Sequence, residues 1–587
     1  MKAFKEYDGL KLPNIAEEVL VKWQEEKTFE KSLTEREGQE TYVFYEGPPS
    51  ANGMPGIHHV MARTIKDLFC RYKTQKGFLV NRKGGWDTHG LPVELGVEKE
   101  LGITKEDIGT KISIDEYNKA CREAVMRYTD QWRDVTEKMG YWVDMDDPYV
   151  TYENEYIESV WWLLSQLYQK GLMYKGYTIQ PYSPAAGTGL SSHELNLPGT
   201  YQDVKDTSAV ALFKVTQDNG RIPAILSAIE EGVMNIMAWT TTPWTLPSNT
   251  ALTVGSKIDY VLVDTFNPYT ATPQKIVLAE ALISKHFKPE GEEADMSCEA
   301  SDKLLPYRVI ERFKGESLVG LRYEQLLPYA QPMEDQENAF QVIAGDFVTT
   351  EDGTGVVHTA PTFGADDMRV AQAAGIPGLL IPNENGDPVP LVDLQGRFVS
   401  EVKDDVWGLA GEPVKAEYLT DDQKAAAFEA QKESLKDIIP NLSNYLSVDE
   451  RISLKLKLEG KAFKVEKYQH NYPHCWRTDK PILYYPLDSW FIKATDAKSK
   501  MIELNNTINW KPASTGTGRF GNWLENLNDW NLSRSRYWGT PLPIWRTGPY
   551  GPLQEECVGA IAEFQEKNAY FITEGCIDEK GNRFEGQ

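Results

Sequence analysis

The sequence predicts a mixed α/β protein in which a β-rich domain interrupts a domain built on a parallel sheet. Near the N-terminus, a strand-like run (41–46), a turn-rich loop, a helical segment and a second strand-like run (78–82) follow one another. This order is that of a βαβ unit, which places its two strands in parallel. From about residue 208 to 400, short β-like runs alternate instead with glycine and proline, which is typical of a separate β-rich domain.

The elements of the first domain follow from local composition. Residues 47–56 (GPPSANGMPG) are rich in Gly, Pro, Ser and Asn, which predicts a loop. A helix is predicted from Ile57 to about Lys76, and the loop 84–92 (GGWDTHGLP) follows the second strand. Residues 157–171 predict a buried helix closed by a glycine cap. The prediction of the helix that begins at Ile57 is based on the helical spacing of Val60, Ile65, Leu68, Phe69 and Tyr72.

The inserted domain is recognised by repeated β-like runs between turn residues. A charged, helix-favouring stretch, about 420–466, leads back to aromatic strand-like and loop segments in 467–545. We therefore divide the chain into a first half-domain (1–195), an insertion with its connecting segments (196–465) and a returning half-domain (466–587). The predicted strands of the insertion lie within 208–215, 235–242, 260–266, 275–280, 339–345 and 353–361.

Composition favours a globular protein. Hydrophobic residues make up 41% of the chain and charged residues 25%, which fits a folded protein better than a disordered one. No stretch approaches the roughly 18 apolar residues that a membrane span needs. The N-terminus has no apolar signal segment, so we expect a cytoplasmic protein with no membrane contact. The net charge of −25 argues against nonspecific coating of nucleic acid but allows a local RNA-binding patch.

Two segments of the first domain carry candidate chemistry. A Gly- and Pro-rich loop that runs into a helix N-terminus can bind phosphate through free backbone N–H groups and the helix dipole. His58 and His59 lie at that helix start, where two imidazoles can neutralise charge on a phosphate; the alternative is that they cap the helix or lie at the surface. Asp87 is expected at the ligand-binding edge of the sheet, and a role as a turn or N-cap residue is equally compatible.

Long segments of the chain resemble the class I aminoacyl-tRNA synthetases, and among them the isoleucine enzymes. YEGPPSANGMPGIHH (45–59) resembles the ATP-binding signature of the family, and GWDTHGLPVE (85–94) is similar to the isoleucine branch. WTTTPWTLPSN (239–249) and GTGVVHTAPTFGADD (353–367) resemble the two editing segments of that branch. The resemblance runs from about residue 10 to 545. It implies a Rossmann-like catalytic domain interrupted by an editing domain, the connective peptide.

The resemblance also implies roles for individual residues. Asp87 is expected to bind the α-ammonium of the amino acid, and Trp538, in the matching segment LSRSRYWGTPLPIW (532–545), to line the side-chain pocket. Asp367 is expected to hold the ammonium of a misattached amino acid. At the synthetic site, the implied ATP-binding residues are Gly56 and the catalytic pair His58 and His59, and the implied amino-acid-binding residues are Gly47, Pro48, Asp87 and Trp538. The implied editing residues are Thr240, Thr241, Thr242, Asn249, His358 and Asp367, the last also catalytic.

The implied reaction joins isoleucine to tRNA(Ile) with ATP and Mg²⁺, and the enzyme is expected to act as a monomer. Positioning and charge stabilisation dominate such a transfer, which suits helix-end donors and imidazoles. Valine lacks one methylene of isoleucine, a difference of only about 1–3 kcal/mol in an apolar pocket, for which isoleucine enzymes are the standard example. A second, hydrolytic pocket is therefore expected. Without the second editing segment, the threonine cluster would be interpreted as an ordinary strand.

Two departures from the family pattern bear on activity. The signature ends Gly56-Ile57-His58-His59, where the family usually reads HIGH, so the first histidine and the glycine have exchanged places. The second catalytic loop of the family, KMSKS, and its anticodon-binding domain are not found in the sequence. We therefore expect an N-terminal fragment with weak or absent synthetic activity. A noncatalytic tRNA-binding or interaction fragment, and an editing hydrolase built from 196–465, are the alternatives.

A third departure concerns metal. Many relatives hold zinc with two CxxC pairs, whereas the six cysteines of this chain form no such pair. The matching positions are Ser183, Ala186, Cys475 and Thr478, so one thiol of four remains. A tetrahedral zinc site needs four good ligands, and we predict that no zinc binds here.

Overall fold

The computed structural model describes residues 9–300, 302–383, 386–546 and 555–566. The predicted mixed α/β class with a β-rich insertion is confirmed. The chain forms two compact units: a split unit (1–174, 491–530 and 536–587) and an inserted unit (175–490 and 531–535). These limits describe packing, and the functional boundaries 1–195, 196–465 and 466–587 stay a prediction. Within the described ranges, no helix is long and apolar enough to cross a membrane.

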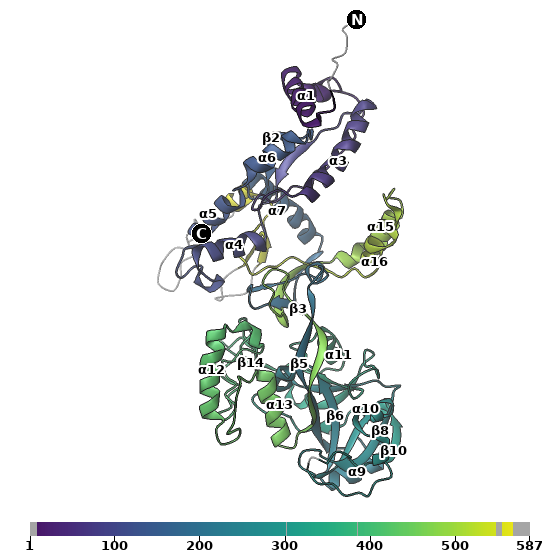
Figure 1. Ribbon diagram of the computed structural model, residues 1–587. Helices are drawn as coiled ribbons and strands as arrows, with labels where there is room; N and C mark the ends of the chain where they lie inside the picture. The colour runs from purple at the N-terminus through teal and green to yellow at the C-terminus, as the bar shows by residue number, and fades with distance from the viewer. Residues whose placement is uncertain (1–8, 301, 384–385, 547–554, 567–587) are drawn as a thin grey trace. The chain divides into compact units, whose positions relative to one another are not determined.

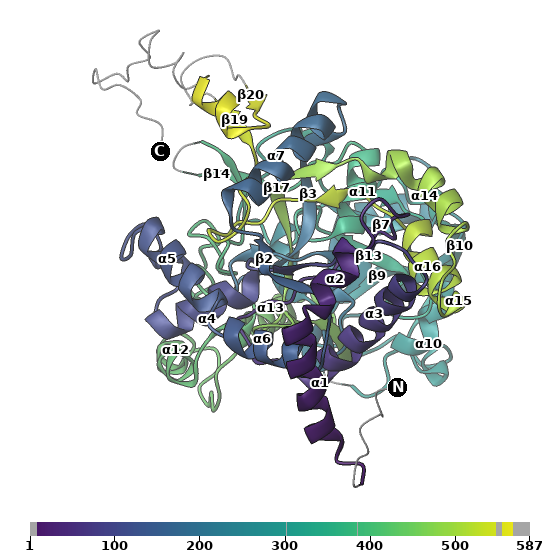
Figure 2. The same ribbon diagram turned by 90° about the horizontal axis from the view of Figure 1, so that it is seen from above.

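The split unit combines helices with a short parallel sheet. Strand β1 (Lys83–Trp86) pairs in parallel with β2 (Asp144–Val150), and α4 and α5 lie side by side (Figures 1 and 2). Its helices from the N-terminal part are α1 (Leu12–Glu26), α2 (Thr28–Thr34), α3 (Ile57–Gln75), α4 (Leu91–Leu101), α5 (Ile114–Val125), α6 (Thr129–Lys138) and α7 (Asn154–Gln169). The returning part adds α14 (Lys498–Asn505), α15 (Ala513–Thr517), α16 (Arg519–Glu525) and the pair β19 (Ile544–Arg546) and β20 (Glu555–Cys557).

The predicted strands of the βαβ unit are wrong in their extent. The runs 41–46 and 78–82 meet only at one parallel bridge, between Thr41 and Leu79, and the second strand begins at residue 83. The first three residues of the predicted loop 84–92 are therefore strand. The reason is close packing: a Cβ at Gly85 would lie 2.4 Å from the Tyr149 ring, so this glycine marks an approach of two strands rather than a turn.

Helix α3 is confirmed, but the side that its apolar pattern predicts to be buried is exposed. The Ile65, Leu68 and Phe69 side chains are 52–65% exposed. The buried face instead carries Arg63, whose guanidinium lies 5.1 Å from the Trp132 ring. Helical periodicity thus predicts the element correctly and its buried face wrongly.

Helix α7 is likewise confirmed, and the predicted glycine follows it. Gly171 has φ 67°, a conformation that favours glycine. The helix is not buried as predicted, because the Trp162 and Leu163 side chains are 56% and 55% exposed. Its apolar composition indicated a core helix, and only Leu164 and Ser165 are buried.

The inserted unit is built on a ten-stranded mixed sheet with the order β10-β8-β9-β6-β13-β7-β12-β11-β5-β16. Its strands β5, β6, β8 and β10 are labelled in Figure 1. Each predicted run of the insertion contributes a strand. The sheet strands are β5 (Tyr201–Gln217), β6 (Met234–Thr240), β7 (Ala251–Val254), β8 (Asp259–Phe266), β9 (Pro273–Ala279), β10 (Arg308–Lys314), β11 (Arg322–Tyr323), β12 (Gln341–Ala344), β13 (Val356–Thr359) and β16 (Ala462–Pro473). A second sheet has the order β18-β17-β3-β4, from Trp530–Asn531, Leu483–Ile492, Met173–Ser183 and Thr188–Gly189.

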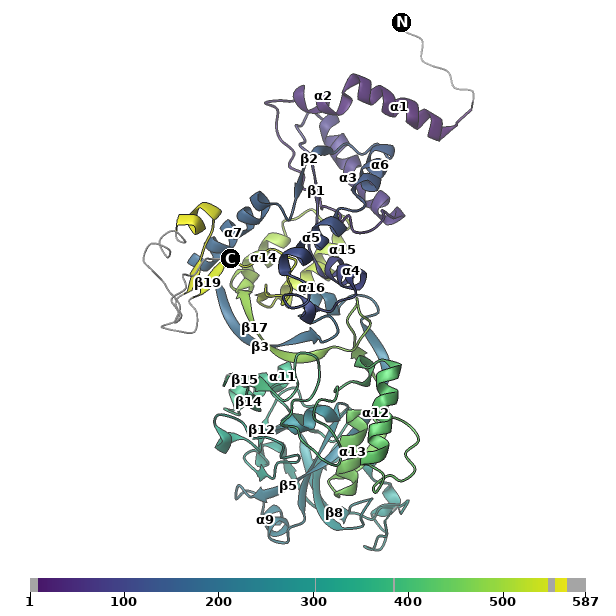
Figure 3. The ribbon, with the colours of Figure 1, turned by 90° about the vertical axis from the view of Figure 1, so that its left-hand side faces the viewer.

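Helices and short turns complete this unit. Helix α13 (Val448–Leu458) packs against β5 and β16, and α12 (Asp421–Ser434) lies beside it (Figures 1 and 3). The predicted helical stretch 420–466 is wrong at its end, because β16 begins at Ala462. The strand-like interpretation of 467–545 also missed α14 to α16. Besides several short 3₁₀ turns, the unit contains α8 (Ser192–Leu195), α9 (Pro223–Glu230), the 3₁₀ helix η2 (Pro243–Ser248), α10 (Ile283–His286), α11 (Ala365–Ala373), and the pair β14 (Leu380–Pro382) and β15 (Pro388–Pro390).

Candidate functional site

The start of α3 uses one of its two histidines as a cap. The backbone N–H of Gly56 donates a hydrogen bond to Nδ1 of His59, at 2.9 Å. Burial, followed by the charges of His58 and Arg63, lowers the pKa of His59. Because Nδ1 accepts, the neutral ring carries its proton on Nε2. His59 therefore caps the helix, which was one of the two expected alternatives for this residue. Its Nε2–H remains as a donor.

In the exchanged signature, the residues at positions 56 and 58 depend on each other for space. A Cβ at Gly56 would lie 2.8 Å from Cε1 of His58 and 3.0 Å from its Nδ1. The His58 and His59 rings lie 3.8 Å apart between centroids. With histidine at position 58, the ring fills the space that a side chain at position 56 needs, so glycine at 56 accommodates it.

A backbone hydrogen bond joins the signature loop to the Asp87 loop, and a tryptophan of α6 holds the signature loop from another side. Nε1 of Trp132 donates to the Gly53 carbonyl at 2.9 Å, and the Asp87 N–H donates to the Pro49 carbonyl at 3.0 Å. Gly47 and Asp87 are exposed, and Pro48 is half-buried. Partial desolvation raises the pKa of the Asp87 carboxyl, and the backbone N–H of His89 opposes this shift. The two predicted binding loops therefore lie together.

Trp538 is held against the Asp87 loop. Its indole Nε1 donates to the Thr88 carbonyl at 2.6 Å, across 450 residues of chain. The His89 ring meets the indole edge to face, with centroids 5.4 Å apart. The structure thus brings Trp538 against the loop that carries Asp87. A shared amino-acid pocket formed by these two residues stays a prediction.

Three residues that the sequence analysis missed fix the position of Trp538. The Arg536 guanidinium contacts the Glu94 carboxylate, with Nε 2.9 Å from Oε2, and also binds Glu98. Glu94 also accepts the N–H of Trp538 at 3.0 Å. All three side chains are buried. The i, i+4 spacing of the two glutamates on α4 was the available signal, since it places both carboxylates on one helix face.

The threonine segment forms a tight turn at the end of β6. Oγ1 of Thr240 accepts the Thr242 N–H at 3.0 Å, and the Thr240 and Thr242 hydroxyls lie 3.3 Å apart. The Thr245 hydroxyl donates to the Thr242 carbonyl at 2.8 Å. Thr241 and Thr242 are half-buried. The turn thus brings two of the three predicted hydroxyls, those of Thr240 and Thr242, close together.

His358 is a neutral link behind this turn. Nδ2 of Asn249 donates to Nδ1 of His358 at 2.9 Å, so the His358 Nε2–H donates to the Thr245 hydroxyl, also at 2.9 Å. Burial lowers the pKa of His358 to about 3, which keeps the ring uncharged. Tyr323, which no sequence motif marks, donates to Oδ1 of Asn249 at 2.7 Å. The sequence-predicted Asn249 and His358 are therefore in direct contact.

Asp367 lies in the first turn of α11. Its Oδ2 accepts the Ala360 N–H at 2.8 Å, two residues beyond His358. Burial raises the pKa of Asp367 to about 6, and the hydrogen bond from Ala360 opposes this shift. A Cβ at Gly364 would lie 2.8 Å from Cγ of Asp367, so glycine allows the carboxylate its position.

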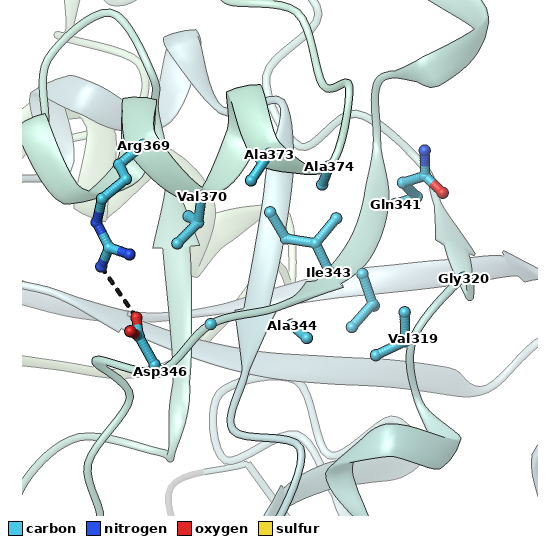
Figure 4. A pocket seen from close by; sticks show the side chains of 12 residues that line it. Val319, Gly320, Gln341, Ile343, Ala344, Asp346, Arg369, Val370, Ala373 and Ala374 are labelled. Atoms are coloured by element: carbon cyan, nitrogen blue, oxygen red, sulfur yellow. Dashed lines mark hydrogen bonds and ion pairs between the residues drawn. The ribbon is translucent and has the colours of Figure 1, made fainter.

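A cavity of about 520 Å³ lies elsewhere in the inserted unit (Figure 4). It is formed by β12, residues 319–320 and the Arg369–Ala374 part of α11 and its end. At its rim, Arg369 pairs with Asp346 at 2.9 Å. None of the sequence-predicted editing residues lines this cavity, so it is distinct from the predicted editing pocket.

The positions that match a zinc site in relatives do not fit zinc. The Ser183 hydroxyl accepts the Ala186 N–H at 3.2 Å and closes its own turn. Cys475 is buried, and its backbone N–H donates to the Lys480 carbonyl at 2.8 Å. Among the residues with described placement, no group of three or more Cys, His, Asp or Glu is arranged to hold a metal ion.

Comparison with known proteins identifies relatives over nearly the whole chain. The family described as class I tRNA synthetases (I, L, M and V) matches residues 18–574. The isoleucine–tRNA ligase of Cytophaga hutchinsonii is 62% identical over 95% of this chain and 48% of its own length. That of Bacteroides fragilis is 60% identical over 96% of this chain and 48% of its own length. The chain therefore spans about half the length of the curated relatives it matches.

The Gly56–His58 coupling predicts a nonadditive pair of substitutions. Gly56→Ala should force the His58 ring from its rotamer, at a cost of about 1 kcal/mol, and should speed amide exchange in the first turn of α3. In a His58→Ala background, the same change should have a smaller effect, because only the cost of replacing the N-cap glycine remains. Hydrogen exchange of residues 56–60 measures both. Equal acceleration in the two backgrounds would contradict the coupling.

The ligand set around Cys475 predicts protein without stoichiometric zinc. The protein is produced in zinc-supplemented medium and then purified. Elemental analysis should give well under one zinc per chain, because one thiol cannot complete a tetrahedral site. A Cys475→Ser variant serves as the control and should give the same value. One zinc per wild-type chain, lost in Cys475→Ser, would show that the ligands were misjudged.

Proposed function

Because the chain belongs to the class I tRNA synthetase family, we propose that it is an isoleucine–tRNA ligase chain that also hydrolyses valyl-tRNA. The observation that carries this proposal is the 62% identity to an isoleucine–tRNA ligase over 95% of the chain. The two predicted sites support it, since their residues gather in separate units. The substrates proposed are isoleucine, ATP with Mg²⁺, and tRNA(Ile).

In the proposed synthetic reaction, the isoleucine carboxylate attacks the α-phosphate of ATP and displaces pyrophosphate. Asp87 would hold the α-ammonium, and Trp538, fixed by Thr88 and Glu94, would form the wall against which the aliphatic side chain packs. The start of α3 would bind phosphate, with Nε2–H of the neutral His59 as a donor. These groups work by position and charge rather than by covalent chemistry.

In the proposed editing reaction, water attacks the ester carbonyl of valyl-tRNA and releases valine and free tRNA. Asp367 would bind the α-ammonium of the valyl group through its charged form. The hydroxyls of Thr240 and Thr242 would orient the ribose or the attacking water. His358 stays neutral and is bonded to Asn249 and Thr245, so we assign it a structural role in this pocket.

A second candidate is an editing hydrolase without synthetic activity. The specific observation that favours it is the inserted unit, which is compact in itself and contains all the predicted editing residues. A noncatalytic tRNA-binding fragment is the third outcome. Isoleucine-dependent exchange of pyrophosphate into ATP, measured beside valyl-tRNA hydrolysis, separates the three. Both activities indicate the ligase, hydrolysis alone the editing enzyme, and neither activity would contradict the proposal.

The editing assignment predicts a large effect at Asp367. Asp367→Ala should slow valyl-tRNA hydrolysis about 10- to 100-fold, because a charge-assisted hydrogen bond contributes about 1.5–3 kcal/mol. The matched control is Asp366→Ala, since Asp366 is adjacent on α11, exposed and paired only weakly, with Arg369 at 3.4 Å. If both variants hydrolyse valyl-tRNA as fast as the wild-type chain, the assignment of Asp367 is wrong.

The raised pKa of Asp367 predicts a pH dependence for editing. A carboxyl with a pKa of about 6 is charged above pH 6 and neutral below it, and only the charged form attracts an ammonium. Valyl-tRNA hydrolysis should therefore rise as the pH increases through about 6. Rates measured between pH 5 and 8 give the profile, and Asp367→Asn should lack this step. An unchanged profile in Asp367→Asn would assign the titration to another group.

A further inference from the structure

The turn that carries the predicted editing threonines is capped from a distant helix. The first residue of η2, Pro243, has no N–H, so Trp244 supplies the first donor of this turn. Its N–H donates to Oδ1 of Asp449 on α13 at 2.8 Å, across 205 residues. Thr242 occupies the N-cap position, yet its side chain makes no capping hydrogen bond. The Thr242 hydroxyl lies 3.3 Å from that of Thr240 instead.

Asp449 is itself fixed by a buried cation. The Lys415 Nζ lies 3.7 Å from Oδ2 of Asp449 and 2.7 Å from Oδ2 of Asp206. It also lies 4.5 Å from the centre of the Tyr472 ring. The Lys415 and Asp449 side chains are 4% and 7% exposed. Two acidic residues and one aromatic ring thus hold the ammonium, and the ammonium orients the carboxylate that caps η2.

We propose that Asp449 is a positioning residue of the editing site, which caps η2 so that the Thr242 hydroxyl stays available to the bound aminoacyl ester. This role rests on the editing reaction proposed above. A threonine at an N-cap ordinarily turns its hydroxyl to the N–H of the second or third helical residue. Asp449 accepts the N–H of the second helical residue, Trp244, from outside the turn. The Trp244 N–H is therefore already satisfied, and the Thr242 hydroxyl is not drawn to it.

The consequence of losing Asp449 follows from local competition. Threonine side chains readily take over free backbone N–H groups nearby. With Asp449 removed, the Thr242 hydroxyl is expected to rotate onto the Trp244 N–H and leave the pocket. The fold is expected to survive, because Lys415 keeps its closer partner, Asp206. The effect should therefore fall on the rate of hydrolysis rather than on tRNA binding.

The chain offers a matched control for this substitution. Asp404 is a second buried aspartate that binds α13: its Oδ2 lies 3.1 Å from Nζ of Lys455, and its side chain is 7% exposed, as for Asp449. Asp404 accepts hydrogen bonds from Tyr329 and the Trp407 N–H. Asp404 makes no described hydrogen bond to η2. The Asp404→Ala variant therefore measures how far the loss of a buried carboxylate near α13 lowers the rate when the turn keeps its cap.

The test compares Asp449→Ala, Asp449→Asn and Asp404→Ala in valyl-tRNA hydrolysis by the full chain. Asp449→Ala should lower kcat about tenfold or more with little change in KM. Asp449→Asn keeps an acceptor for the Trp244 N–H and should retain most of the rate, as should Asp404→Ala. In a Thr242→Ala background, Asp449→Ala should have no further effect. Hydrogen exchange of the Trp244 amide follows the cap directly and should accelerate most in the double variant Asp449→Ala with Thr242→Ala, where neither acceptor is left for this N–H.

Several results would overturn the positioning role. Hydrolysis by Asp449→Ala at the wild-type rate would do so, as would equal losses in Asp449→Ala and Asp404→Ala or additive losses with Thr242→Ala. If Asp449→Ala does not fold, Asp449→Asn decides: a rate reduced as far as that of Thr242→Ala would show that charge, not capping, matters. A wild-type chain that does not hydrolyse valyl-tRNA would overturn the proposed function and this role together, which distinguishes that failure from the others.

Discussion

Burying a donor or acceptor without a partner costs about 1–3 kcal/mol, and in both candidate sites the partner comes from a distant part of the chain. Trp538 reaches the Thr88 carbonyl across 450 residues. The Trp244 N–H reaches Asp449 across 205 residues, and Asn249 reaches His358 across 109. Each pairing satisfies a buried group, and those of Trp538 and of Asn249 with His358 also fix residues that the sequence assigns to a site.

The pairing of Trp538 with Thr88 requires that the chain return to the split unit after the insertion. Strand β5 and strand β16 run antiparallel from Tyr201↔Pro473 to Ala211↔Ala462. Closing a long loop costs entropy that grows only slowly with its length, and a ladder of this extent offsets that cost. The segment beyond β16 can then supply Arg536 and Trp538 to the same unit as α4, where Glu94 and Glu98 neutralise the arginine.

The sequence predicts those features that depend on local pattern. The helix after the signature loop and the β runs of the insertion belong to this class, because apolar periodicity and turn residues identify them. The buried face of α3 does not belong to it, because an apolar pattern indicates a helix but not the element against which that helix packs. Gly85 was interpreted as part of a loop although it serves close strand packing. Asp449 and Tyr323 carry no motif at all, because their partners are fixed only by the tertiary fold.

A crystal structure of the chain with a non-hydrolysable valyl-adenosine analogue would test the central claim, that Asp367 and the threonine turn form one editing pocket. The analogue should place its ammonium within hydrogen-bonding distance of the Asp367 carboxylate and its sugar beside the hydroxyls of Thr240 and Thr242. His358 should keep its bonds to Asn249 and Thr245. An analogue bound instead in the cavity beside β12, or absent from the inserted unit at saturating concentration, would contradict the claim.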